Sequence, residues 1–257
     1  MSGTEARAAA RLLAARAGSR IVALPPDERP ADLAAALAVQ RAGIAARGAA
    51  TLGWKVGCTS PGAEKLLGYD RPFYGRLVEG LFHQSPVTLA GGDFVARVLE
   101  AEYAFRLGRD LPPSGQPYTA ETVADAVAAV HPAIEVVDTA FVDWLAVGIE
   151  SLIADNGGHG AFIIGPAVED WRGLDLVDGR VTFAVDGGAA VEGKGANVLG
   201  NPLASLAWLA NETASVGGLK AGEIVTTGSA IAPQKVGPDA KATATFAGLG
   251  EVGVTFR

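Results

Sequence analysis

Apolar and polar positions follow a helical spacing in the first 50 residues and an alternating, strand-like spacing over much of the rest. Residues 4–16 and 31–47 are rich in alanine, and their charged side chains recur at intervals that suit one face of a helix. Pro30 and Gly48 are of the residue types that commonly begin and end a helix. These patterns predict an N-terminal helical part.

Alternation dominates after residue 50. The stretch TLGWKVGC, residues 51–58, places Trp54 and Val56 on one face of a strand and Lys55 and Gly57 on the other. Further strands are expected at 95–107, 131–141, 160–165, 223–228, 241–246 and 251–256, and helices at 60–68, 119–130 and 202–217.

The composition is that of an ordinary globular protein. Of the 257 residues, 49% are hydrophobic and 19% are charged, and no internal repeat or low-complexity linker divides them. We therefore predict an α+β fold in which a helical cap, residues 1–50, covers one mostly β core, residues 51–257.

Charge and cysteine content narrow the partners and the compartment. The formal net charge is −7 and no run of Lys or Arg is longer than a pair, which argues against a nucleic-acid partner. Cys58 is the single cysteine, so an intramolecular disulfide is excluded and the cytoplasm is the expected location. No apolar stretch reaches the roughly 18 residues that a membrane span needs. The first 20 residues are interpreted as an amphipathic helix, with an organellar transit peptide as the alternative.

Two carboxylates stand in the middle of an apolar segment, VARVLEAEYAFRLGRDL. On a strand, Glu100 and Glu102 share a face, and that face either meets water or lines a site. The next residue on the face, Ala104, does not favour water, and Glu135 lies in a second apolar strand. Carboxylates away from water cost several kcal/mol unless something compensates them. Three carboxylates suit a hard cation, Mg²⁺ or Mn²⁺, and no Cys/His spacing supports zinc.

Other polar residues have a functional and a structural interpretation. Lys55 is either a surface lysine or a site residue whose pKa an apolar wall would lower. In the stretch TTGS, the hydroxyls of Thr227 and Ser229 and the backbone around Gly228 either bind a substrate carboxylate or form a plain turn. Asn156 is a left-handed turn residue or a member of a polar pocket.

The histidines and the cysteine are weaker candidates. His131 is expected to close the helix at 119–130, and His159, among glycines, is a secondary candidate to line the site. Cys58 is interpreted as a small core residue rather than a nucleophile, because no His or Asp partner stands near it.

Several segments, in order, together resemble one enzyme group. They are GWKVGCTSPGAEKLLG, PFYGRL, EAEYAFRLGRDLP, HPAIEVVD, ADN with GAFIIG, and GNPLASLAWLAN with LKAGEIVTTGS and FAGLGEVGVTF. The chain resembles the 2-keto-4-pentenoate hydratase and 4-oxalocrotonate decarboxylase group of the fumarylacetoacetate hydrolase superfamily. The resemblance extends from about residue 30 to the C-terminus.

The resemblance implies a mixed β-sandwich roll with an N-terminal helical part, and a homo-oligomer. It implies that Glu100, Glu102 and Glu135 hold Mg²⁺ or Mn²⁺ and that Lys55 transfers protons or pairs with the substrate's charge. The implied substrates are small molecules, 2-hydroxy-2,4-dienoates and their 2-oxo tautomers from aromatic-compound degradation. We interpret the chain as a metal-dependent lyase that hydrates such a substrate, with no membrane partner.

One departure from the group keeps other activities open. Phe73 in PFYG stands where the hydratases carry an Asp that helps the lysine to handle water, and Glu79 is a conceivable substitute. A 4-oxalocrotonate-type decarboxylase is one alternative, because decarboxylation needs no positioned water. An acylpyruvate C–C hydrolase is another, although His83 has no Glu three residues on. The last is a catalytically silent keto-acid-binding relative.

Overall fold

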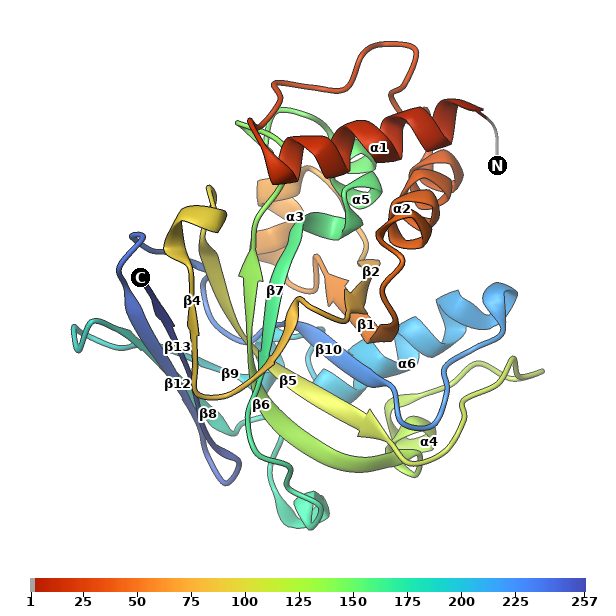
Figure 1. Ribbon diagram of the computed structural model, residues 1–257. Coiled ribbons are helices and arrows are strands. Elements are labelled where there is room, and N and C mark those ends of the chain that lie inside the picture. Colours follow the sequence, from red (N-terminus) through yellow and green to blue (C-terminus); the bar gives the residue numbers. More distant parts are fainter. Residues whose placement is uncertain (1–2) are drawn as a thin grey trace.

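The N-terminal helices pack together at one end of the molecule, as the computed structural model of residues 3–257 shows (Figure 1). Helix α1 (Gly3–Ala17) is amphipathic, as predicted, and α2 (Leu33–Arg47) lies beside it. The Asp32 side chain accepts a hydrogen bond from the Ala35 N–H at the start of α2, and Gly48 ends the helix in the left-handed conformation. Apolar side chains of both helices, among them Leu12 and Val39, pack with Ala140, Phe141 and Ala154.

The larger sheet contains eight strands and carries the polar residues singled out above. Its order is β2-β1-β10-β5-β6-β7-β3, with β11 paired to β5. The bounds are β1 (Thr51–Gly57), β2 (Phe73–Val78), β3 (Phe82–Gln84), β5 (Val98–Leu107), β6 (Val127–Val137), β7 (His159–Ile164), β10 (Ile224–Ser229) and β11 (Gln234–Lys235). The long antiparallel pair β5–β6 lies at its centre and is almost wholly buried.

The smaller sheet packs beside the larger one and completes the roll (Figure 1). It has five strands in the order β4-β13-β12-β8-β9. Their bounds are β4 (Val87–Leu89), β8 (Arg180–Val185), β9 (Val191–Lys194), β12 (Lys241–Phe246) and β13 (Gly250–Phe256). One large apolar core joins the two sheets, and the edge-on pair Tyr103–Phe246 lies within it. The predicted α+β roll is confirmed, while the division at residue 50 stays a prediction.

Four short helices connect the strands: α3 (Pro61–Leu67), α4 (Ala120–Ala124), α5 (Ile149–Ala154) and α6 (Pro202–Glu212). Ser60 caps the start of helix α3, and Gly68 caps its end, as the glycine in the sequence predicts. Among the described residues, no helix has both the length and the apolar character needed to cross a membrane.

The predicted helix at 119–130 is wrong in its second half. Helix α4 ends at Ala124, and β6 begins at Val127. His131 consequently lies inside a strand, opposite Ala104, and does not close a helix. The alanines of this stretch favour a helix locally. Pairing with the ten-residue strand β5 and burial on both faces outweigh that preference of a few tenths of a kcal/mol per residue.

Candidate metal centre and active-site cavity

Three carboxylates meet on one face of the central strands. Glu100 and Glu102 project from β5, and Glu135 on β6 is the direct cross-strand partner of Glu100. One carboxylate oxygen from each lies within 4.8 Å of the others. Glu102 and Glu135 are fully buried, and Glu100 lines a cavity. Glu100 is partly exposed to this cavity, so the carboxylate face lines a site rather than the outer surface.

Two oxygens of this cluster lack a donor. Glu102 Oε2 accepts hydrogen bonds from the Gly228 N–H, at 2.8 Å, and from the Thr226 hydroxyl. Among the described residues, Glu102 Oε1 and Glu135 Oε2 are buried with no hydrogen-bond partner. A buried carboxylate oxygen without a donor is costly, and a cation satisfies it. An all-oxygen donor set fits a hard divalent cation, so these residues suit Mg²⁺ or Mn²⁺ rather than zinc.

Lys55 points into the same cluster from β1. The pairing of the strands explains this direction. Lys55 is paired with Thr226 on β10, and Thr226 is paired with Ala104 on β5. Ala104 is the next residue after Glu102 on the carboxylate face. The small Ala104 side chain leaves room in this row. Lys55 Nζ lies 3.1 Å from Glu135 Oε1 and donates a hydrogen bond of 2.9 Å to the Gly157 carbonyl.

Charge, rather than burial, decides the state of Lys55. Burial alone would lower its pKa, but Glu135, Glu100 and Glu102 together raise it, so the ammonium stays charged at neutral pH. The expectation that an apolar wall would lower this pKa is therefore wrong. Burial likewise acts to raise the pKa of Glu135, but the charge of Lys55 and the hydrogen bond from His159 lower it below its usual value.

The pKa values of the other two carboxyl groups, Glu100 and Glu102, are raised. Burial and the charge of Glu135 raise the pKa of Glu100 to about 7, and the same two causes raise that of Glu102 well above its ordinary value. Without a cation the cluster thus holds protons at neutral pH. Binding a cation must release them.

The raised pKa of Glu100 predicts how the stability of the metal-free protein depends on pH. A carboxyl whose pKa is higher in the folded state, about 7 against 4.5, stabilises the fold fully below pH 4.5. That contribution is lost as the pH rises through 7. Between pH 6 and pH 8 in EDTA, we expect a loss of about 1 kcal/mol, or about 3 °C in Tm. Mg²⁺ should raise Tm more at pH 8 than at pH 6.

Differential scanning fluorimetry at several pH values checks this expectation. Glu100→Gln serves as the matched variant, because it removes the titrating group and should reduce the pH dependence of the Mg²⁺ effect. A Mg²⁺-induced rise in Tm that is equal at pH 6 and pH 8 would contradict the assignment.

His159 is a site residue that the sequence only weakly suggested. Its Nδ1 lies 2.9 Å from Glu135 Oε1, and the ring is fully buried. Burial lowers the pKa of His159, so the neutral ring donates its Nδ1–H to the carboxylate. It therefore fixes the orientation of Glu135 beside Lys55. The feature of the sequence that suggested His159 was its position directly after the glycine-containing turn ADNGG. Thr226 and the Gly157 carbonyl were missed because their roles depend on strand register.

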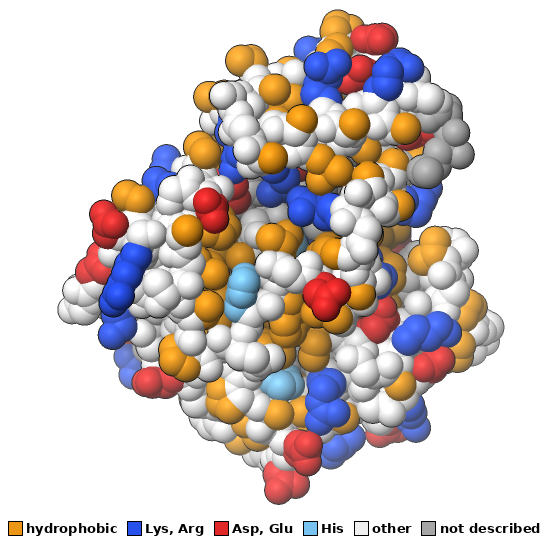
Figure 2. Space-filling view, viewed as in Figure 1, with side chains coloured by type: hydrophobic (Ala, Val, Ile, Leu, Met, Phe, Trp, Pro, Cys, Tyr) orange, Lys and Arg blue, Asp and Glu red, His pale blue; other side chains and the backbone are white. Residues whose placement is uncertain are grey.

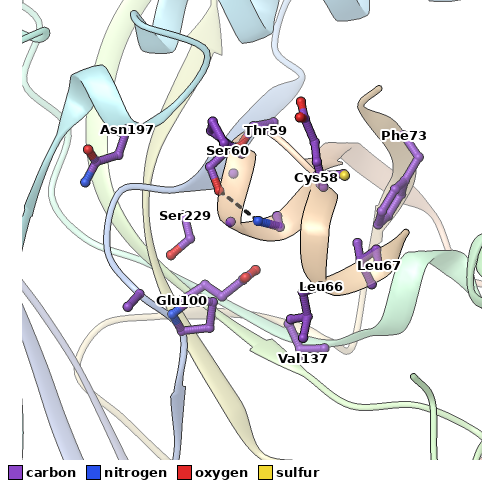
Figure 3. Close-up of a pocket in the computed structure, with 18 of the residues that line it drawn as sticks. Cys58, Thr59, Ser60, Leu66, Leu67, Phe73, Glu100, Val137, Asn197 and Ser229 are labelled. Atoms are coloured by element: carbon purple, nitrogen blue, oxygen red, sulfur yellow. Dashed lines mark hydrogen bonds between the residues drawn. The ribbon is translucent and has the colours of Figure 1, made fainter. Parts of the chain in front are cut away.

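The carboxylate cluster borders a cavity of about 920 Å³. In Figure 3, Glu100 and Ser229 lie on one side of this cavity, and Leu66 and Leu67 of helix α3 lie on the other. Lys55 also lines it. The cavity is large enough for a small organic ligand.

The predicted substrate-binding residues separate into two groups. Gly228 and Ser229 line the cavity, but the Gly228 N–H donates to Glu102 and the Ser229 hydroxyl donates to the Ile231 carbonyl, so both donors already have partners. Thr227 is turned away, and its hydroxyl donates to the Tyr103 carbonyl. Asn156 is a turn residue with φ of 57°. Its side-chain amide accepts a hydrogen bond from the Arg76 N–H and donates one to the Arg76 carbonyl, so it does not face the cavity.

Phe73 forms an apolar wall beside Lys55. Its ring centroid is 5.6 Å from Lys55 Nζ, and it packs against Gly57 and Gly157, where an added Cβ would come within 2.7 Å of the ring. Phe73, the residue at the position where the resemblance implies an Asp, thus presents an apolar ring to Lys55. Glu79 does not replace that carboxylate, because it is exposed, lies beyond the end of β2 and does not line the cavity.

The remaining candidates, His83 and Cys58, lie in positions that suggest a structural role. His83, on β3, borders a separate hollow below the N-terminal helices. Cys58 is buried and packs with Phe73 and Leu152, as expected for a core residue. Burial raises the pKa of its thiol to about 11, so it carries no nucleophilic thiolate at neutral pH. Figure 2 shows Lys and Arg side chains dispersed among Asp and Glu on the face in view, without a single basic patch.

A β-roll with a buried Glu-x-Glu pair, a third Glu and a lysine defines a class of metal-dependent enzymes. Residues 73–257 match the family described as fumarylacetoacetate (FAA) hydrolase C-terminal, and the chain belongs to this family. The hydratase and decarboxylase relatives described next identify it as a lyase that uses a divalent metal.

Individual relatives within the family include hydratases and a decarboxylase. The chain is 35% identical to a 2-keto-4-pentenoate hydratase of Burkholderia vietnamiensis over 257 residues, 96% of this chain and 95% of the relative. It is 33% identical to a TodF product hydratase of Pseudomonas putida, covering 97% of this chain and 94% of the relative. Among solved structures, 4-oxalocrotonate decarboxylase from Pseudomonas putida G7, complexed with magnesium and adipate, is similar with a TM-score of 0.89. The identity is 28%, covering 98% of this chain and 97% of that one.

Proposed function

We propose that this protein is a divalent-metal-dependent hydratase that adds water to a 2-hydroxy-2,4-dienoate, the 2-keto-4-pentenoate type of substrate, in the degradation of aromatic compounds. The observation that carries the proposal is the buried cluster of Glu100, Glu102 and Glu135 with Lys55 at one end of the cavity. Hydratase relatives that match along nearly the whole chain support it.

The three carboxylates are proposed to hold Mg²⁺ or Mn²⁺. When bound, such a cation supplies a Lewis acid for the 2-oxygen of a substrate that also presents a carboxylate. The chain's own part is to orient the substrate and to handle protons. We propose that the charged Lys55, 3.1 Å from Glu135, stabilises negative charge or delivers a proton, and that His159 keeps Glu135 in position. Ser229 is proposed to contact the substrate carboxylate, for which its hydroxyl has to turn from the Ile231 carbonyl.

Phe73 supports a second candidate, decarboxylation of a 4-oxalocrotonate-type acid. A phenyl ring accepts no proton and positions no water, whereas loss of CO₂ requires chiefly an electron-accepting site and a dry cavity. Phe73 provides an apolar wall at Lys55. The similar decarboxylase structure is consistent with this candidate. An acylpyruvate hydrolase is less well supported, since His83 lies outside this cavity.

A spectrophotometric assay tests the two reactions together. The purified protein is given 2-hydroxypenta-2,4-dienoate or 2-oxohex-3-enedioate, each with Mg²⁺, Mn²⁺ or EDTA. Both acids are conjugated, so the loss of ultraviolet absorbance reports the reaction. We expect metal-dependent loss on the first acid without CO₂.

CO₂ released from the second acid would instead establish the decarboxylase. Failure on both acids, with metal binding shown by calorimetry, would contradict both reactions and favour a keto-acid-binding relative. Rates that are equal in EDTA and in Mg²⁺ would contradict the role of the three carboxylates.

We also infer a homo-oligomer in the cytoplasm. Val22 and Val142 are 80% and 63% exposed and flank the bridge between Ile21 and Phe141, which supports self-association through this region. The single, buried Cys58 supports a reducing compartment.

A further inference from the structure

We propose that Arg16 and Asp155 position Lys55, by fixing the turn whose Gly157 carbonyl accepts a hydrogen bond from the lysine ammonium. Neither side chain is among those that line the cavity, so both act through Lys55 and are positioning residues rather than catalytic ones. The inference rests on the proposed function only for the part that Lys55 plays in turnover. The position of the ammonium itself can be measured without any substrate.

The Lys55 ammonium lies between two acceptors of different kinds. Glu135 Oε1 is 3.1 Å from Nζ, and the Gly157 carbonyl oxygen is 2.9 Å from it. Glu135 is also a proposed metal ligand, so its charge is shared with a bound cation. The carbonyl has no such second role, and it therefore remains available to the ammonium when a cation is bound.

The backbone that presents this carbonyl has an uncommon conformation. Asn156, Gly157 and Gly158 have φ angles of 57°, 64° and 71°, so three successive residues are left-handed. Asn adopts this conformation at some cost, and such backbone persists where the surrounding structure fixes it. The Asn156 amide bonds the backbone of Arg76 on β2, and the Gly158 carbonyl accepts from the Asp138 N–H at 2.9 Å. These contacts fix the middle and the end of the turn.

Arg16 of helix α1 fixes the beginning of the turn. Its Nε lies 2.7 Å from Asp155 Oδ1 and its Nη2 lies 3.0 Å from Oδ2, which makes a two-pronged ion pair. Nη2 also donates to the carbonyls of Asp155, at 3.1 Å, and of Asp138, at 2.9 Å. The Asp155 side chain is only 3% exposed, so its charge depends on this pair and on the Ala140 N–H, which donates to Oδ2. One guanidinium therefore joins the start of the turn to the segment that bonds its end.

The N-terminal helices supply these contacts from outside the family match. Arg16 comes from α1, and the match begins only at residue 73. The buried Gln40 of α2 donates to the Ile153 carbonyl of α5, which leads into the turn, and to the Tyr74 carbonyl of β2, which borders it. The helical part therefore does more than cover the core, because it fixes the turn beside the cavity lysine.

Substituting Arg16 with Gln should displace the ammonium without removing a side chain that lines the cavity. We expect kcat to fall about 10- to 100-fold on whichever acid the protein turns over, because a small misplacement of a reacting group costs up to about 100-fold. KM and the calorimetric Kd for Mg²⁺ should stay within about twofold, since the three carboxylates are unchanged.

Two further variants allow for a folding failure of the first. Asp155→Asn keeps the side-chain volume and leaves the unpaired charge on Arg16, which is partly exposed, so it should give the same result as Arg16→Gln. Arg16→Lys keeps the charge but loses the fork that bonds both carboxylate oxygens, so it should show smaller effects of the same kind.

Arg11→Gln is the matched control. Arg11 lies on the same helix and makes the same two-pronged pair with the buried Glu28, at 2.7 Å and 3.1 Å. Glu28 belongs to the connection between α1 and α2 rather than to the turn. This variant should change neither kcat nor the position of the Lys55 ammonium.

The ammonium gives a readout that does not depend on activity. Lys55 is the only buried lysine among residues 3–257, and hydrogens of a buried, hydrogen-bonded group exchange slowly with water. NMR of protein with isotope-labelled lysine should therefore show one slowly exchanging ammonium signal. We expect Arg16→Gln to abolish this signal and Arg11→Gln to retain it, with thermal unfolding showing that each variant is folded.

A folded Arg16→Gln or Asp155→Asn protein with an unchanged ammonium signal would overturn the proposal, and so would an equal loss in Arg11→Gln. Loss of the signal with an unchanged kcat, or in a protein that turns over neither acid, would support the positioning but contradict the proposed role of Lys55. Turnover by the unsubstituted protein, together with an unchanged signal in the variants, would have the opposite meaning.

Discussion

Substituting Glu102 with Gln is expected to lower the metal-dependent kcat/KM about 1,000-fold or more while the protein remains folded. Gln keeps the shape of the side chain, and its carbonyl oxygen still accepts from the Gly228 N–H and the Thr226 hydroxyl. It loses the negative charge at Oε1, the buried oxygen that has no donor. Electrostatic stabilisation at such a centre contributes several kcal/mol to the transition state, and each 1.36 kcal/mol is about tenfold in rate.

The same substitution is expected to stabilise the metal-free protein. Burial and the neighbouring carboxylates raise the pKa of Glu102, which means that its charge is unfavourable in the folded state. Removing it should raise the free energy of unfolding in EDTA by about 1–3 kcal/mol at pH 8. Mg²⁺ should then no longer raise Tm as it does in the unsubstituted protein.

Calorimetric Mg²⁺ titration, thermal unfolding and the dienoate assay measure these effects on one preparation. Glu251→Gln is the matched control, because Glu251 is an exposed strand residue of the smaller sheet whose carboxylate accepts a hydrogen bond from the Thr245 hydroxyl. It should change neither metal binding nor rate. A Glu102→Gln protein with an undiminished metal-dependent rate would show that the metal site is elsewhere.

Replacing Lys55 with Met is expected to lower kcat by about 100- to 10,000-fold, the range for loss of a proton-transferring group, while metal binding becomes tighter. Lys55 is buried, and its charge compensates the three carboxylates. Without it, their uncompensated negative charge attracts a cation more strongly, and we expect a Kd for Mg²⁺ lowered by about tenfold. Lys55→Met should therefore lose activity but bind Mg²⁺ more tightly, whereas substitution of a metal ligand should weaken Mg²⁺ binding.

Folding needs a separate check in this variant. Glu135 loses its ion pair with Lys55, and an unpaired buried charge destabilises a protein by about 3–5 kcal/mol. Mg²⁺ should restore most of the lost Tm by binding Glu135. Lys241→Met, at an exposed position of the smaller sheet, is the control that should alter neither quantity. Weaker Mg²⁺ binding in folded Lys55→Met protein would contradict the charge-compensation argument.

The clustering of the three carboxylates was predictable because the information lies in local patterns. A two-residue spacing places Glu100 and Glu102 on the same side of any strand, and the apolar context of all three Glu residues signals burial. The termination of α2 at Gly48 was equally local, since glycine adopts the left-handed conformation with little strain. The wrong helix prediction at 119–130 has the opposite origin. Residues 127–130 pair with strand β5, and this pairing outweighs the local helix preference of their alanines.

By itself, the sequence determined the alternation of the strands, the helical N-terminal part and the chemistry of the donor set, since each depends on neighbouring residues along one chain. Only the tertiary structure decided that His159 supports Glu135, that Thr227 and Asn156 face away from the cavity, and that the Phe73 ring lies beside Lys55. These facts depend on register between strands distant in sequence and on which side chains fill the space between them. A shift of one residue reverses the face of every side chain in a strand, and spacing along the chain does not specify that register.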